Sequence, residues 1–514
     1  MNWQPSNPTM RALLNAFIQE APEIYAVGGF VRDQLLGKTK DLADLDLVTS
    51  YSAMAISKQV ADRVGWAYYP LDESRDMGRL VFTANVGEPL VCDVARMRGD
   101  TIETDLLARD FTINAMAVAY TKNQAPRLID VVGGEADLKQ KLVRRVNMAS
   151  LAEDPVRMLR AVRLCQQLGF SLDLETRQQI ERISDTLNAT SPERLRDELW
   201  KIMALEQPDQ GLEELRRLGL LRHALPELSA TVGVEQSAPH TLDVYQHTLY
   251  TIRYARILRD WLKGVQPLGR EQQALADLLQ PYLFFLRQHF LKPIAGQRLR
   301  ADWLVWLALF HDIGKPTTRT AEINADGTVR YHFFEHDLRG AEMTVRRLER
   351  MRFSRNEIDL ADAVIRGHMR PHLLDLSFRK QALSRRACYR FFRDIGAQNS
   401  GGQNFADPAG IDTLLLALAD VQAMRPSFVP DTWQEYCKHV GELLYFAYSD
   451  ETAANSRQKP FVDGHSVMRH TGIQPGKPLG EVLEAIFEAQ VAGEVTSPEE
   501  ALMLASQLVR DRKN

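Results

Sequence analysis

Hydrophobic and polar positions change their period after about residue 150, which predicts two kinds of architecture. Before it, the apolar runs IYAVGG, LDLVT, RLVFTANV and LVCDVARM are typical of strands, the last two forming a hairpin across a Gly-Glu-Pro turn. From about Leu151 the apolar positions recur at helical spacing, and SPERLRDELWKIM begins a helix with Ser191 as N-cap and Pro192 at the first position. We therefore predict an α+β head followed by all-helical segments.

Length and composition indicate several ordinary folded domains. The chain has 514 residues, of which 45% are hydrophobic and 25% charged, and at about 150 residues per domain this predicts three to four domains. We expect a head over 1–145, a helical neck over 146–235, a third domain over 236–428 and a helical tail domain over 429–514. The tail suits either RNA contact or simple packing.

Charge is unevenly distributed although the total is only −4, from 63 Lys and Arg against 67 Asp and Glu. Residues 21–138 carry 12 basic and 18 acidic residues, whereas 139–170 carry seven basic and two acidic residues. An acidic head beside a basic segment is typical of a polymerase-like enzyme, which needs carboxylates for metal and basic residues for phosphates, although unrelated domains also differ in charge.

Cysteine content and apolar stretches argue against secreted and membrane classes. The four cysteines form no CxxC pair and are too few for a disulfide framework. The longest apolar stretch, near 303–310, falls well short of the roughly 18 residues that span a membrane, and the first residues do not resemble a signal peptide. We expect a cytoplasmic protein with no membrane partner.

A glycine pair and a carboxylate pair are the first candidates for chemistry. Gly28 and Gly29 follow a strand and open a helix, where backbone N–H groups can approach a phosphate, although the pair alone is more typical of a plain turn. Asp44 and Asp46 share one face of a strand, and Asp93 on a later strand is a third candidate. Mg²⁺ would neutralise these acids, whereas an isolated D-x-D more often solvates a strand end.

The order of motifs through 21–228 resembles the class II tRNA nucleotidyltransferase and poly(A) polymerase family, members of the polymerase-β-like superfamily. After GGFVRD and DLDLVT come DLLARDFTINAMA, LIDVVGGEADLKQKLVRRV, EDPVRMLRAVRLCQQLGF, ERLRDELWK and GLLRHALPEL. The resemblance implies a polymerase-β-like head and a template-independent enzyme that extends tRNA 3′ ends with CTP. It leaves open whether ATP is also used, and whether CC, A or CCA is added.

The resemblance also assigns roles to individual residues. It implies that Asp44 and Asp46 bind the catalytic Mg²⁺ and that the triphosphate lies near the glycine motif, represented by Gly28, Gly29, Arg32 and Asp33. The family's RRDFT motif recognises the ribose, and here Arg109 and Asp110 carry it because Ala108 stands where the family has its first arginine.

The family's EDxxR motif selects the incoming base, which implies this role for Asp154 and Arg157, after Glu153. Asp154 before a proline is also a good helix cap, which alone would explain the acid. Arg160 and Arg163 continue a basic stripe that suits RNA phosphates or a solvated helix face equally well.

A short connection precedes the ARDFT segment. Only six residues separate Arg98 from Asp105, where CCA-adding members usually carry a flexible loop of some length. A shortened loop is similar to that of members that add CC and leave the final A to another enzyme.

All twelve histidines lie at or after His223, so the chemistry of the first 222 residues does not use imidazole. Over about 240–425 the chain resembles an HD phosphohydrolase domain, in which imidazoles and carboxylates hold Mn, Fe, Ni, Co or Zn better than Mg alone. His332 and His372 are interpreted as bystanders, and His465 and His470 receive no catalytic role. The matching ligands are His247, His311, Asp312, His336, His368 and Asp420.

Three alternatives to tRNA extension stay open from the sequence. A poly(A) polymerase shares the head, although that branch generally lacks an HD domain. A hydrolase would use the HD site as its main activity, with the head as an RNA-binding module. A pure RNA-binding or scaffold protein would require both carboxylate sets to be vestigial.

Overall fold

The computed structural model describes residues 3–38, 44–83, 89–269, 272–378, 381–396, 408–424, 433–449 and 460–512. The chain divides into two compact units, Met1–Leu205 with Gln210–Ala224, and Glu206–Asp209 with Leu225–Asn514. The predicted boundary at 428 lies outside the described residues, and the division into four domains stays a prediction.

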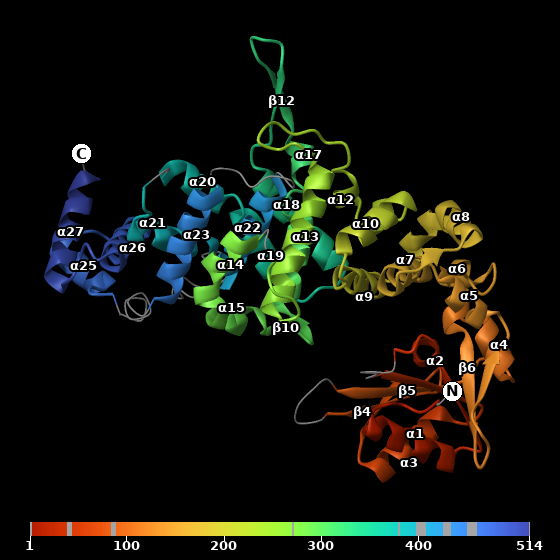
Figure 1. The fold of residues 1–514 in the computed structure, drawn as a ribbon. Helices are drawn as coiled ribbons and strands as arrows, with labels where there is room; N and C mark the ends of the chain where they lie inside the picture. Colours follow the sequence, from red (N-terminus) through yellow and green to blue (C-terminus); the bar gives the residue numbers. More distant parts are fainter. Residues whose placement is uncertain are drawn as a thin grey trace. The chain divides into compact units, whose positions relative to one another are not determined.

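A mixed seven-stranded sheet forms the centre of the first unit's head (Figure 1). Neighbouring strands are antiparallel except β2 and β5, which run parallel. The predicted hairpin is confirmed as the antiparallel pair β4–β5. From one edge to the other the strands are β3 (Ala67–Asp72), β4 (Met77–Phe82), β5 (Leu90–Arg96), β2 (Asp44–Thr49), β1 (Glu23–Val27), β6 (Met116–Thr121) and β7 (Arg127–Asp130).

Alternation along β2 separates a core face from a face that bears acids. Leu45 and Leu47 are buried, whereas Asp44 and Asp46 are exposed, as the period of two predicts. On the side of the acids, Val48 joins a hydrophobic cluster with residues of α4 (Ile102–Leu107), the helix that follows β5. The carboxylates and α4 therefore share one side of the sheet.

Helices and short strands complete the first unit, and α10 continues across the boundary between the units. A short parallel pair of strands, β8 (Leu142–Val143) and β9 (Ser171–Leu172), brackets α7. The helices are α1 (Pro8–Glu20), α2 (Gly29–Leu35), α3 (Ala53–Val64), α4, η1 (Thr112–Asn114), α5 (Gly134–Gln140), α6 (Ser150–Glu153), α7 (Val156–Leu168), α8 (Leu174–Ile183), η2 (Ser184–Ala189), α9 (Pro192–Met203), α10 (Pro208–Arg217) and α11 (Leu221–Ala224).

The second unit is built on helices, with α13, α16 and α22 packed against one another. Nearly every residue of α16 is buried, which explains its continuous apolar run. Its helices are α12 (Pro226–Ser229), α13 (Val244–Leu262), α14 (Gln273–Leu279), η4 (Gln280–Tyr282), α15 (Leu283–Phe290), α16 (Arg300–Phe310), α17 (Lys315–Thr318), α18 (His336–Arg350), α19 (Arg355–Gly367), α20 (Arg370–Phe378), α21 (Arg385–Gly396), α22 (Pro408–Met424), α23 (Trp433–Tyr448), α25 (Gly464–Thr471), α26 (Lys477–Ala492) and α27 (Pro498–Asp511).

The prediction of helices alone after residue 151 is wrong in three places. Besides β9, the structure contains the pair β10 (Pro293–Ala295) and β11 (Arg298–Leu299), and the hairpin of β12 (Thr320–Ile323) with β13 (Val329–His332), which projects from the unit in Figure 1. The hairpin strands are largely exposed, so they lack the apolar alternation that marks a buried strand. No helix in the described ranges combines the length and apolarity that crossing a membrane requires.

Candidate active site and a buried histidine–aspartate centre

Three carboxylates lie side by side on one face of the sheet. Asp44 and Asp46 project from β2, and the register of β2 with β5 places Asp46 beside Asp93. The pKa of Asp46 is raised, because the surrounding protein withdraws water from its carboxylate and because Asp93 repels its charge, while Arg109 acts in the opposite direction. This donor set fits a divalent cation of the Mg²⁺ type.

Arg79, which the sequence pattern did not single out, holds the third carboxylate. Its Nε and Nη2 donate to the two carboxylate oxygens of Asp93 at 2.7 Å each. The hydrogen bond to Asp93 raises the pKa of Arg79. Because β4 and β5 pair antiparallel with these residues opposite each other, aligning the predicted hairpin would have found the contact. Asp93 thus lies at the site with its carboxylate already paired with Arg79.

Gly28 brings the glycine motif against the carboxylates. Its φ of +70° is a conformation that residues with a side chain rarely adopt. A Cβ atom at this position would lie 3.5 Å from Asp46 Oδ2 and 3.6 Å from Arg109 Nη1. The motifs that contain Gly28, Asp46 and Arg109 therefore meet at one point. The next residue, Gly29, begins α2.

Arg32 and Asp33 connect the glycine motif to the ARDFT segment. The buried Arg32 donates through Nε and Nη2 to the Asp33 carboxylate at 2.8 and 2.9 Å, and through Nη1 to Asn114 Oδ1 at 2.8 Å. Asn114 follows the ARDFT residues and is itself buried. Arg32 is thus committed to protein partners, and a role for this pair near a triphosphate stays a prediction.

Charged partners orient both residues of the predicted ribose motif. Arg109 donates through Nε and Nη2 to the buried Asp105 at 3.0 and 2.9 Å. Asp110 lies 2.9 Å from Arg160 Nε on α7 and raises the pKa of that arginine. The ion pair between Asp110 and Arg160 therefore links the head to α7 in the basic segment.

The two arginines predicted to bind RNA both contact carboxylates within the protein. Arg160 contacts Asp110, and Arg163 donates to Glu198 on α9 at 2.8 Å. An RNA phosphate would have to compete with these carboxylates. The RNA-binding role of Arg160 and Arg163 stays a prediction.

The helix-cap explanation of Asp154 is wrong. Pro155 is the N-cap of α7, and no side chain caps this end. Asp154 Oδ2 instead accepts from Arg194 Nη2 at 2.6 Å, while its Oδ1 is buried without a hydrogen-bond partner among the described residues. Arg157 Nε lies 3.6 Å from Asp154 Oδ2. A buried acceptor beside an arginine suits the edge of a base.

We expect Asp154→Ala to reduce the preference between CTP and ATP by about tenfold to a hundredfold, because one or two hydrogen bonds to a base edge contribute about 1–3 kcal/mol of discrimination. The measurement is kcat/KM for single-nucleotide incorporation with each nucleotide. Asp197→Ala, on the neighbouring helix α9 with a side chain 53% exposed, is the matched control. Equal losses with CTP and ATP would contradict a role in base choice.

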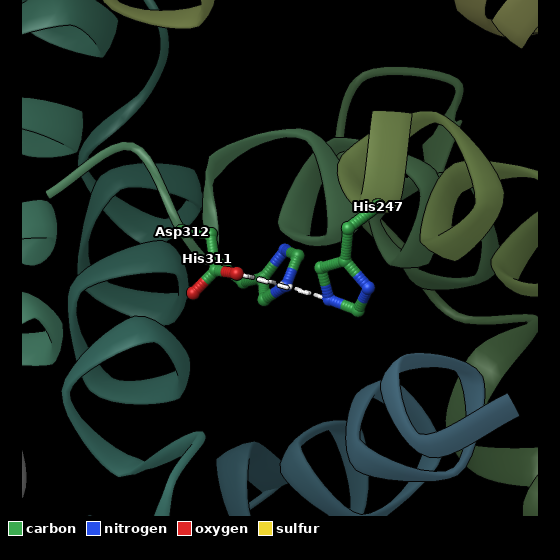
Figure 2. Close-up of side chains that lie close together, drawn as sticks. All are labelled: His247, His311 and Asp312. Carbon is green, nitrogen blue, oxygen red and sulfur yellow. Dashed lines mark hydrogen bonds and ion pairs between the residues drawn. The ribbon is translucent and has the colours of Figure 1, made fainter. Parts of the chain in front are cut away.

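A second constellation lies inside the second unit, where helices bring four histidines and two aspartates together. All six side chains are buried, and Figure 2 shows three of them pointing toward one another. The residues are His247 on α13, His311 and Asp312 after α16, His336 at the start of α18, His368 after α19 and Asp420 on α22.

Asp312 joins two groups of potential ligands. Its Oδ2 lies 3.7 Å from His247 Nε2 and 3.2 Å from His311 Nε2. Its Oδ1 lies 3.5 Å from His336 Nε2 and 3.9 Å from His368 Nε2. Each half of the centre thus offers two imidazoles and a shared carboxylate close enough to hold a metal ion.

Backbone hydrogen bonds orient three of the imidazole rings. A ring that donates its Nδ1–H to a carbonyl keeps the Nε2 lone pair for the centre, which is the tautomer that a metal ligand needs. Imidazoles in this state together with carboxylates fit a divalent transition metal. The Nδ1 atoms of His311, His336 and His368 lie 2.8, 2.7 and 2.6 Å from the carbonyl oxygens of Ala308, Phe333 and Ile365.

The two halves of the centre differ electrostatically. Burial alone would lower the pKa of His311, but the carboxylates of Asp312 and Asp420 outweigh it and raise that pKa to about 10. Burial lowers the pKa of His368 to about 3, with His336 and His311 acting in the same direction. The half of the centre formed by His247, His311 and Asp312 therefore attracts positive charge strongly.

Two residues at this centre were missed or misread in the sequence. His372, interpreted as a bystander, lies with its Nε2 3.0 Å from Asp420 Oδ2 and orients that carboxylate. Lys315 Nζ lies 2.6 Å from Asp312 Oδ2. His372 lies four residues after His368, near the start of α20, and this closeness in sequence was the available signal. His332 instead lies on β13 and contacts Glu322.

Models of three protein families match the chain. The "Poly A polymerase head domain" matches residues 24–144, the "Probable RNA and SrmB-binding site of polymerase A" matches 169–231, and the HD domain matches 244–420. Among solved structures, a CCA-adding enzyme in complex with ATP aligns with a TM-score of 0.59 at 20% identity, covering 98% of this chain and 96% of that one. The Thermotoga maritima CCA-adding enzyme with tRNA aligns with a TM-score of 0.54 at 20% identity, covering 99% and 97%. These structures show that the fold is shared.

Several curated relatives match the chain over nearly its full length, and two of them are at least 30% identical to it. The A-adding tRNA nucleotidyltransferase of Deinococcus radiodurans is 32% identical, covering 93% of this chain and 94% of its own length. The CC-adding tRNA nucleotidyltransferase of Thermus thermophilus is 30% identical, covering 93% and 92%. With the polymerase head, the RNA-binding region and the HD domain in the same order, this chain belongs to the tRNA nucleotidyltransferase family and is a nucleotidyltransferase.

Proposed function

We propose that this enzyme adds two cytidine residues to tRNA 3′ ends, using CTP, and leaves the terminal adenosine to another enzyme. The RNA 3′-hydroxyl attacks the α-phosphate, a new phosphodiester forms and pyrophosphate leaves. Asp44 and Asp46, with Asp93 beside them, would hold Mg²⁺, which neutralises developing charge in phosphoryl transfer. Asp154 and Arg157 read the base, and the basic neck binds the RNA backbone.

The observation that carries CC addition is the short connection between Arg98 and Asp105. The chain turns at Gly99, whose φ is +74°, and α4 begins at Ile102. These residues are ordered into a turn and a helix, which leaves no length for a flexible loop at this position. Relatives named for CC addition and for A addition both match the chain, so base choice is decided by experiment.

The experiment uses purified protein and two tRNA substrates, one truncated at the discriminator base and one that already ends in CC. CTP alone, ATP alone or both are supplied, and the product ends are sequenced. Ends that stop at CC with both nucleotides present support the proposal. Complete CCA ends, or A addition restricted to tRNA that already ends in CC, would overturn it. Homopolymeric A tails would favour the poly(A) polymerase alternative.

We further propose that the histidine–aspartate centre hydrolyses phosphoesters. The observation in its favour is the geometry of two ligand groups joined by Asp312, with three imidazoles held in the metal-ligand tautomer. The ligands would be His247, His311, His336, His368, Asp312 and Asp420, and a bound Mn, Fe, Ni, Co or Zn ion would act as a Lewis acid on the phosphoester.

A further inference from the structure

His240 lies against the histidine–aspartate centre, although it belongs to neither group of potential metal ligands. Its ring packs edge-on against the ring of His247, with 4.9 Å between the ring centroids and 83° between the ring planes. Its Nδ1 atom is buried and has no hydrogen-bond partner among the described residues. Because buried polar atoms are nearly always hydrogen-bonded, this nitrogen indicates a partner that is not part of the protein.

The charged groups that act most strongly on His240 are all at the centre. Burial lowers the pKa of its ring to about 3, and Lys315 and His247 act in the same direction. The carboxylates of Asp420 and Asp312 act in the opposite direction. The half-buried ring therefore faces the charged groups of the centre, where a phosphoester would have to bind.

The loop that carries His240 is fastened to the centre on one side and to α13 on the other. Gln236 Oε1 accepts from Lys315 Nζ at 2.7 Å, and the same Nζ lies 2.6 Å from Asp312 Oδ2. After His240, the side chain of Asp243 caps α13 by accepting a backbone N–H at 2.7 Å. These contacts fix the position of His240 without any ligand, so its nitrogen is preorganised.

We propose that His240 binds the phosphoryl group of a phosphoester at this centre, with its Nδ1–H donating to a non-bridging oxygen. The inference rests on the phosphoester hydrolysis proposed above. Phosphoryl oxygens accept hydrogen bonds and carry negative charge, which the cation of Lys315 also favours. With metal bound, the carboxylates of Asp312 and Asp420 are neutralised and do not repel the anion. An apolar ligand would leave the nitrogen without a partner.

The test removes the nitrogen and then restores a donor. His240→Phe keeps an aromatic ring against His247, whereas His240→Asn returns an N–H close to the place of Nδ1. Both are made in an Asp46→Asn parent, so that metal at the head does not contribute. Calorimetry gives the Kd of inorganic phosphate for the Ni²⁺-loaded enzyme, and hydrolysis of bis(p-nitrophenyl) phosphate gives KM and kcat.

We expect His240→Phe to raise the Kd of phosphate and KM about tenfold with kcat within about twofold, which marks a loss of binding. His240→Asn should stay within about threefold of the parent, because it keeps the donor. Ni²⁺ should raise Tm equally in the parent and in both variants, since His240 is in neither ligand group. His465→Phe, at an exposed histidine of α25, is the matched control and should behave as the parent.

Phosphate affinity equal to that of the parent in His240→Phe would mean that only water contacts the nitrogen, and would overturn the inference. A loss of the Ni²⁺-induced rise in Tm would show that the ring supports His247 instead, with the same consequence. A His240→Asn variant as weak as His240→Phe would count against the N–H donor. A parent that binds Ni²⁺ and phosphate but hydrolyses no phosphoester would contradict the proposed function, and the phosphate affinities would still decide the inference.

Discussion

Asp46→Asn is expected to reduce nucleotide incorporation into tRNA at least a thousandfold, an increase of about 4 kcal/mol in the activation barrier. Asp46 lies between Asp44 and Asp93, and burial and the charge of Asp93 raise its pKa, so a cation beside its carboxylate would be stabilising. Asparagine keeps the shape of the side chain but removes the charge that attracts the metal. The measurement is single-turnover incorporation of CTP at saturating Mg²⁺.

Asp62→Asn, an exposed aspartate on α3, controls for the loss of a head carboxylate and should keep full activity. Metal-dependent phosphoester hydrolysis by the second unit should be unchanged in Asp46→Asn. Normal RNA extension by this variant would contradict the assignment of the head.

Asp312→Asn is expected to abolish metal-dependent phosphoester hydrolysis, by at least about a hundredfold, because Asp312 is the ligand common to both halves of the centre. The substrate is bis(p-nitrophenyl) phosphate, with Mn²⁺, Ni²⁺ or Co²⁺ supplied separately. The variant should also lose the rise in Tm that these ions give the wild-type enzyme, since binding to the native state alone is stabilising. Nucleotide incorporation should persist, because the head carries its own acids.

His470→Ala provides the control for histidine-dependent metal binding, since His470 is exposed on α25. It should keep both the hydrolysis and the metal-induced rise in Tm. Hydrolysis that survives in Asp312→Asn would show that the activity arises elsewhere. A metal-induced rise in Tm that survives would contradict the ligand set.

Local patterns predicted four strands of the head, the change to helices after it and most of the candidate chemical groups. The alternation of Asp44, Leu45 and Asp46 predicts which side chains share a face, because a strand has a period of two. The β4–β5 hairpin followed from its own turn and strand composition. The histidine and aspartate residues were predicted as a group because their order in the chain resembles that of a known domain. They converge in the structure, and their role as metal ligands stays a prediction.

Long-range partners were decided by tertiary structure. In the sequence, Asp154 has the position of a helix cap. Only the tertiary structure shows that its carboxylate accepts a hydrogen bond from Arg194 on α9 and does not cap α7. The sequence shows no partner for His372, whereas in the structure its ring on α20 contacts Asp420 on α22. The hairpin of β12 and β13 escaped prediction because its strands are exposed and carry no buried face.

By itself the sequence determined that this protein has an acidic head with paired carboxylates, a basic segment and a histidine–aspartate set, because residue type and spacing are local properties. Tertiary structure alone decided the partners of these groups. It placed Arg79 on Asp93, His372 on Asp420, and Asp312 between two groups of candidate metal ligands. The physical reason is that ion pairs and hydrogen bonds act over a few ångströms, and chain folding, not sequence distance, sets which groups come that close.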